Sequence, residues 1–235
     1  MAILVGIDGT GGGFFPGKAR DEQYDRDFAN SFVKRLCSGG ATYRKYFRGP
    51  VTLGGGLMAA IAEGSQFVVN TLGMAPGQPV LLTGYSRGAA GAVAVAKRLK
   101  SANINVRALM LFDCVDRHLF ADASVIPNNV GYVMHVVRDP KSKSRESFSN
   151  DGLRYTPPTV YPAAYKFLCT HGGMGGTPWQ PKPGQAMTEL INEGLPDGKT
   201  TISFAEDARV SVEVWRYVQP FLRTHGFLGG AGSPS

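Results

Sequence analysis

The chain has 235 residues, of which 43% are hydrophobic, and a formal net charge of +7. This length and apolar content suffice for one core, so we expect a single domain over residues 1–225 and a flexible tail over residues 226–235. Three cysteines without metal-type spacing exclude a disulfide framework and a zinc module, and no apolar run has the length of a membrane span.

Apolar runs alternate with helix-like segments along the chain. In chain order, strands are expected near residues 2–7, 79–84, 105–112, 131–137 and 163–169, and helices near 22–36, 56–73, 88–101, 183–193 and 204–222. This alternation predicts the α/β class, with a mostly parallel sheet flanked by helices. Functional side chains are then expected at the carboxyl ends of the strands.

The first expected strand leads into a glycine-rich loop, residues 8–13. Because glycines allow the backbone to approach a substrate closely, the N–H group of Thr10 or Gly11 is a candidate donor to an oxyanion. A strand followed by Asp-Gly-Thr-Gly is also how actin-like sugar kinases begin, where the turn binds phosphate. No second turn of this kind follows in the sequence, which disfavours the kinase.

The pentapeptide Gly84-Tyr85-Ser86-Arg87-Gly88 stands between an expected strand and an expected helix. In a Gly-x-Ser-x-Gly turn the serine adopts a strained conformation, and glycines two residues away avoid a collision across the turn. The strain exposes the serine hydroxyl at the edge of the sheet. We therefore expect Ser86 to be a nucleophile and the Arg87 N–H to be an oxyanion donor; an ordinary strand–helix loop is the alternative.

A serine nucleophile needs a base, and the chain has four histidines. In enzymes with this turn the order along the chain is serine, acid, histidine, with the histidine on a loop after a late strand. His171 fits best, because it follows the apolar segment 163–169 and precedes a glycine-rich loop. His118 and His135 are the alternatives, and His225 lies beside the expected tail.

Three aspartates are candidates for the acid that orients the histidine. Asp113 follows the expected strand 105–112, Asp116 lies three residues further on, and Asp139 follows the expected strand 131–137. We prefer Asp113, at the carboxyl end of a buried strand, and keep Asp139 as the alternative acid. For each of them, a helix N-cap or a solvated loop carboxylate is the structural interpretation.

Four motifs taken together resemble a known family. They are Asp8-Gly9-Thr10-Gly11, Gly84-Tyr85-Ser86-Arg87-Gly88-Ala89, Phe112-Asp113-Cys114-Val115 and His171-Gly172-Gly173-Met174-Gly175-Gly176. Their order and gaps over residues 1–180 resemble the α/β-hydrolase domain of type VI secretion phospholipase effectors and their uncharacterised relatives. The resemblance implies an α/β-hydrolase-like fold with Ser86 as nucleophile, Asp113 as acid and His171 as base. The family's late motif is usually His-Ser-Asp-Val-Gly-Gly and its post-strand motif Asp-Thr-Val, and this chain differs at both.

Serine chemistry of this kind needs no cofactor and no metal, and neither is expected. Because the sequence shows no secretory leader, the default expectation is a cytoplasmic protein with reduced thiols at Cys37, Cys114 and Cys169. Delivery by a specialised secretion system is a further option.

Two basic segments are candidates for contact with anionic phospholipid, namely residues 141–145 and the basic–aromatic residues 43–48. Together with Phe14-Phe15-Pro16, the second segment is a candidate rim for an acyl pocket. Solvated surface is the alternative for both. No nucleic-acid module is recognisable, so nucleic acid is not an expected partner.

These residues together predict a serine hydrolase that cleaves carboxylic esters, with lipid or phospholipid acyl esters as expected substrates. A catalytically silent scaffold of the same fold, acting as a binding or interaction module, is the alternative.

Overall fold

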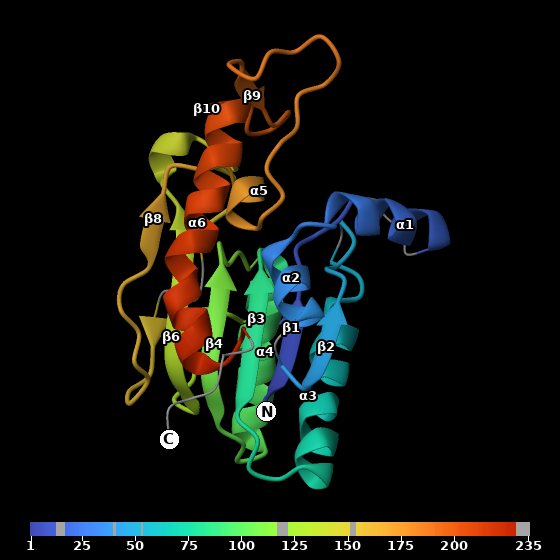
Figure 1. Cartoon of the computed structure of the whole chain (residues 1–235), viewed down its shortest axis with the longest axis vertical. Helices are drawn as coiled ribbons and strands as arrows, with labels where there is room; N and C mark the ends of the chain where they lie inside the picture. Colours follow the sequence, from blue (N-terminus) through green and yellow to red (C-terminus); the bar gives the residue numbers. More distant parts are fainter. Residues whose placement is uncertain (13–16, 40, 53, 117–121, 151–153, 229–235) are drawn as a thin grey trace.

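The computed structural model describes residues 1–12, 17–39, 41–52, 54–116, 122–150 and 154–228. Its centre is a six-stranded sheet with the order β2-β1-β3-β4-β6-β8, in which all neighbouring strands are parallel (Figure 1). These strands are β1 (Ile3–Ile7), β2 (Tyr43–Phe47), β3 (Val80–Tyr85), β4 (Val106–Phe112), β6 (Val130–Arg138) and β8 (Tyr165–Phe167). The predicted α/β class with a parallel sheet is confirmed.

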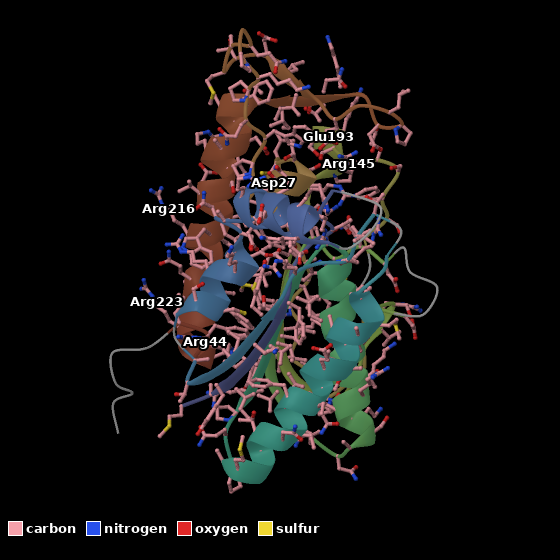
Figure 2. All side chains as sticks on the ribbon, turned by 90° about the vertical axis from the view of Figure 1, so that its right-hand side faces the viewer. Asp27, Arg44, Arg145, Glu193, Arg216 and Arg223 are labelled. Carbon is pink, nitrogen blue, oxygen red and sulfur yellow. The ribbon has the colours of Figure 1, made fainter. Side chains whose placement is uncertain are left out.

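Helices cover both faces of the sheet (Figure 2). One face packs against α3 (Leu57–Met74) and α4 (Arg87–Ser101), and the other against α1 (Lys18–Asp27), α2 (Phe32–Ser38) and α6 (Phe204–His225). Successive strand residues point to opposite faces, so in β1 Val5 lies in the first core and Leu4 in the second. A strand covered on both faces must be apolar throughout, which explains the continuous apolar runs in the sequence.

Short elements lie beyond the carboxyl edge of the sheet. β9 (Leu190–Asn192) pairs antiparallel with β10 (Lys199–Ser203), and a small core of Ile191, Ile202 and Phe204 lies beneath this hairpin. The 3₁₀ helix η1 (Pro140–Ser142) and the short helix α5 (His171–Met174) belong to the same region. A two-stranded parallel pair, β5 (Val125–Ile126) and β7 (Arg154–Tyr155), forms separately.

The predicted helix over residues 183–193 is wrong. Residues 182–190 are all exposed, and the segment continues into β9. Gly184 has φ 88°, a left-handed conformation that a right-handed helix cannot contain. Without a buried face, this segment has no packing to stabilise a helix.

The predicted helix over residues 22–36 is two helices, α1 and α2. Ser31 separates them and caps α2, because its hydroxyl accepts a hydrogen bond from the Lys34 N–H. Strand β2 was not predicted from the sequence, since it lies at the edge of the sheet and its exposed Arg44 and Lys45 interrupt the apolar pattern.

The described part of the chain reaches into the expected tail. Gly226 ends α6 with φ 87°, and Phe227 N–H then bonds back to the Leu222 carbonyl. Phe227 is fully buried in the core beneath α6. Residues 229–235, the rest of the expected tail, lie outside the described residues.

Candidate active site

Ser86 stands on a sharp turn between β3 and α4. Its φ of 56° and ψ of −129° are strained for a residue with a side chain. A Cβ on Gly84 would lie 2.4 Å from the Gly88 carbonyl oxygen, and one on Gly88 would lie 2.2 Å from the oxygens of Ile7 and Asp8. Both glycines are therefore required by close backbone approach, as the elbow motif predicts.

The structure brings Ser86, Asp113 and His171 together. The Nε2 atom of His171 lies 2.8 Å from Ser86 Oγ, and its Nδ1 atom lies 2.6 Å from Asp113 Oδ2. The three residues follow β3, follow β4 and begin α5 respectively, so they meet at the carboxyl edge of the sheet. All three are buried.

We expected His171 on a loop after a late strand, but it begins the short helix α5. Thr170 caps α5 through a hydrogen bond from the Gly173 N–H. The His171 N–H donates to Ser144 Oγ at 2.8 Å, and its carbonyl accepts from the Tyr85 hydroxyl at 2.9 Å. The backbone that carries the imidazole is thus held from two sides.

Besides the histidine ring, three donor groups from two residues bind the Asp113 carboxylate. Its Oδ2 accepts from Arg138 Nη1 at 2.6 Å, while its Oδ1 accepts from the Arg138 N–H at 3.1 Å and from Asn150 Nδ2 at 2.7 Å. Sequence reasoning missed Arg138 and Asn150. The available signal for Arg138 was a charge at the end of an apolar strand, next to a candidate acid.

The environment fixes the charge states of the pair. Burial acts to raise the pKa of Asp113, but the hydrogen bonds and positive charges of His171 and Arg138 outweigh it and hold that pKa well below its usual range. Burial lowers the pKa of His171, which the contact with Asp113 offsets in part. At neutral pH the carboxylate is therefore ionised and the imidazole neutral, with Nδ1 as donor to Asp113 and Nε2 as acceptor from Ser86.

The other candidate acids have local roles. Asp139 Oδ1 accepts the Lys141 N–H at 2.8 Å and caps η1, which is the structural interpretation that we held open. Asp116 Oδ2 accepts the Ala123 N–H at 2.9 Å. Asp113 is the aspartate that contacts the His171 ring.

The alternative bases are placed differently from His171. His135 Nε2 accepts the Cys114 N–H at 3.2 Å, and its Nδ1 lies 3.2 Å from the Tyr161 hydroxyl. At the end of α6, the His225 ring packs against Tyr132 in a tilted arrangement, with the ring centres 4.6 Å apart. His118 lies outside the described residues.

The loop after β1 forms one wall beside the serine. Thr10 and Gly11 line the same cleft as Ser86 and Arg87. Beneath the loop, the buried carboxylate of Asp8 accepts hydrogen bonds from the Gly9 N–H, the Ser31 hydroxyl and the Tyr46 hydroxyl. Burial raises the pKa of Asp8 to about 6, against the opposing effect of these donors. Sequence reasoning had not given Asp8 this anchoring role.

A cleft of about 1420 Å³ opens from the Ser86–His171 pair. Aromatic side chains line much of it: Phe28, Phe32, Tyr85, Phe148, Trp179 and Trp215. Five cationic residues, Arg26, Lys34, Arg35, Arg87 and Arg145, line it as well, with Asp27 and Glu193. The guanidinium of Arg35 lies 4.2 Å from the centre of the Trp215 ring. The cleft therefore combines apolar area with positive charge.

Each basic segment has one arginine that is paired within the protein. Arg48 pairs with Asp25 at 2.7 Å, and Arg145 pairs with Asp197 at 3.3 Å. In Figure 2, Arg44 lies well below Arg145 and Glu193, which are in the upper part of the molecule. Phe14, Phe15 and Pro16, the other expected rim residues, lie outside the described residues.

Among the described residues, no helix combines the length and the hydropathy that crossing a bilayer requires. No group of three or more His, Cys, Asp or Glu side chains among the same residues is arranged to hold a metal ion.

Comparison with known proteins gives structural likenesses. No protein-family model and no curated protein matches the sequence. A similar solved structure is the Tle1 effector bound to the VgrG spike of the type VI secretion system, with 15% identity and a TM-score of 0.44 over 81% of this chain and 54% of that one. The sequence motifs resemble this class of effector.

Two other solved structures share part of the fold. YbtT, a type II thioesterase of the yersiniabactin pathway, has 20% identity and a TM-score of 0.29 over 50% of this chain and 44% of its own. A cutinase-like protein from Cryptococcus sp. has 19% identity and a TM-score of 0.31 over 53% and 59%. This chain thus spans about half the length of the structures that it matches. Because all three TM-scores are below 0.5, the function proposed next rests on the geometry of this chain.

Proposed function

We propose that the protein is a serine hydrolase that cleaves carboxylic esters, with Ser86 as nucleophile, His171 as general base and Asp113 as the acid that orients it. The observation that carries the proposal is the continuous hydrogen-bond series from Ser86 Oγ through His171 to Asp113 Oδ2, with contacts of 2.8 and 2.6 Å. The strained turn at Ser86 supports it, because such strain is retained where it serves a function.

The geometry supports a two-step acyl transfer. Ser86 Oγ bonds to the carbonyl carbon of the ester while its proton passes to His171 Nε2, and the carbonyl oxygen becomes an oxyanion. The N–H of Arg87, the first residue of α4, and the N–H of Thr10 or Gly11 across the cleft are the proposed oxyanion donors. His171 then protonates the leaving alcohol. Water, deprotonated by His171, hydrolyses the acyl-enzyme.

The cleft supports an amphipathic ester, of which a lipid or phospholipid acyl ester is the proposed example. Its aromatic lining suits an acyl chain, since burial of apolar area is favourable. Lys34 and Arg35, one turn of α2 from Phe32, provide positive charge for an anionic group of the same substrate. Peripheral contact with an anionic membrane and delivery by a secretion system remain proposals based on net charge and on the motif resemblance.

A fluorophosphonate probe and a substrate panel test this function. The probe is expected to label Ser86, identified by peptide mapping, and the panel of short esters, long esters and phospholipids to be hydrolysed with a preference for long acyl chains. Labelling with cleavage of short esters alone would retain the hydrolase and remove the lipid substrate. An unlabelled Ser86 with no ester cleaved would favour the silent scaffold.

A further inference from the structure

A buried arginine lies directly behind the candidate catalytic acid. Arg138 ends β6, and only 5% of it is exposed. Its Nη1 atom lies 2.6 Å from Asp113 Oδ2, the oxygen that His171 Nδ1 also contacts at 2.6 Å. Its backbone N–H binds the other oxygen, Oδ1. One oxygen of Asp113 is thus shared between a guanidinium and the imidazole of the base.

The remaining donors of Arg138 hold the wall of the cleft. Its Nε binds the Ser144 carbonyl at 2.9 Å, and its Nη2 binds the carbonyls of Arg145 and Phe148 at 3.0 and 2.6 Å. This wall contacts the base in turn. Ser144 Oγ accepts the His171 N–H, and the Phe148 ring meets the imidazole edge-on at 5.4 Å. A single guanidinium therefore connects the acid, the base and the segment between them.

The shared oxygen changes the chemistry of the base. A carboxylate stabilises the imidazolium that forms when Ser86 loses its proton. Arg138 already neutralises much of the Asp113 charge, so less of it is available to His171, and the two cations repel each other. His171 is consequently a weaker base that stays neutral to lower pH, and the positive charge of Arg138 contributes to its lowered pKa.

The other ionisable groups around His171 do not replace this effect. Directly after β9, Glu193 reaches the His171 backbone through Ser144 and favours protonation of the ring, but its charge is shared with Arg145. From β3, burial raises the pKa of Tyr85 well above 10, so its phenol stays neutral. From α6, Asp207 binds the Thr170 N–H and hydroxyl.

We propose that Arg138 is a positioning residue of the active site, which clamps Asp113 to residues 144–148 and keeps the site active on the acid side of neutrality. This inference rests on the proposed hydrolase function and concerns the pH range in which that same site is active. The clamp has two separable consequences, one geometric and one electrostatic.

The variants Arg138→Gln and Arg138→Lys separate these consequences. Glutamine removes the charge, while lysine keeps it but cannot bind all three carbonyls at once. With a short soluble ester, we expect the plateau of kcat/KM to fall in both variants. The acid limb of the pH profile should rise by about one unit in Arg138→Gln and stay within a few tenths of a unit in Arg138→Lys. An unmoved limb in Arg138→Gln, or an equal movement in both variants, would overturn the proposal.

A titration without substrate distinguishes failure of this proposal from failure of the hydrolase. The ¹⁵N NMR signals of the His171 ring, assigned with His171→Ala, should titrate at higher pH in Arg138→Gln than in the parent. If no ester is cleaved but this shift appears, the hydrolase fails and the clamp stands; hydrolysis with an unmoved titration removes the clamp. If Arg138→Gln does not fold, Arg138→Lys decides, because a plateau of kcat/KM equal to that of the parent would contradict the clamp.

Discussion

The two sides of the active site are built by different means. On the nucleophile side, β1, β3 and α4 place Ser86 through backbone contacts so close that Gly84 and Gly88 admit no Cβ. On the base side, β8, α5 and β9 have only three or four residues each, and side-chain hydrogen bonds of Asp113, Arg138 and Glu193 hold the chain in place. Regular structure thus suffices to place the proposed nucleophile, whereas the position of the proposed base depends on a buried polar network.

The largest effect is expected from Ser86→Ala, which removes the hydroxyl that the nucleophile side holds in place. Ester hydrolysis should fall by about 10⁵-fold or more, because a triad acts as a unit and the covalent step is lost. The thermal unfolding midpoint should stay close to that of the parent, because the side-chain hydrogen bond that alanine removes is the one to His171 Nε2. Activity within about tenfold of the parent would remove Ser86 from the mechanism.

Asp113→Asn tests the centre of the base side. We expect turnover to fall by on the order of 10³ to 10⁴-fold, because an amide cannot stabilise the imidazolium and favours the wrong tautomer. Asp139→Asn is the matched control, since Asp139 caps η1 and should alter turnover by less than about threefold. Kinetics with a soluble ester measure both; the reverse ranking would make Asp139 the acid.

Gly88→Ala tests whether close backbone approach holds the nucleophile side. The new Cβ would lie 2.2 Å from two carbonyl oxygens, so we expect the free energy of unfolding to fall by about 3 kcal/mol. Gly73→Ala in α3 is the control, because nothing lies within 4 Å of its Cβ position and alanine favours a helix by up to about 1 kcal/mol. Urea unfolding measures both; equal changes would mean that helix propensity decides.

Asp8→Asn tests the anchor beneath the oxyanion loop. The pKa of Asp8 is raised from 3.8 to about 6, so the folded state favours the protonated form, and stability should fall as pH rises from about 4 to about 6, by up to about 3 kcal/mol. Asparagine removes this dependence. Between about pH 4 and pH 6, the free energy of unfolding of the variant should therefore rise relative to that of the parent. A difference that stays constant with pH would show that Asp8 titrates normally.

The smallest effect is expected from Glu193→Gln, on the base side. Glu193 is buried and accepts from the Ser144 hydroxyl and the Arg145 N–H at 2.8 and 2.7 Å. Weakening these charge-assisted bonds should lower the free energy of unfolding by about 2 kcal/mol and reduce turnover through Ser144 and His171. The exposed Glu63→Gln on α3 should change stability by less than about 0.5 kcal/mol. Equal effects in the two variants would contradict a special role of the network.

The errors of sequence reasoning fall on both sides of this comparison. The strands around Ser86 were placed to within about one residue, because each is apolar and bounded by turn residues. The predicted helix over 183–193 became turns and β9, since burial of Ile191 beside Ile202 decided that segment rather than periodicity. Edge strand β2 was missed for the corresponding reason, because its pairing with β1 stabilises it although its own sequence lacks a continuous apolar pattern.

The sequence by itself determined the α/β class, the elbow at Ser86 and a short list of partners, because local spacing and apolar runs dictate strands, turns and helices. Tertiary structure placed Asp113, and not Asp139, against the His171 ring, although each follows a parallel strand. The direction of a side chain at a strand end depends on the segments that pack over it. Tertiary structure also brought Arg138 to the carboxylate of Asp113. A charge at the end of an apolar strand marks Arg138 in the sequence. A buried ion pair joins residues far apart in the chain, however, so no local pattern shows which carboxylate this charge pairs with.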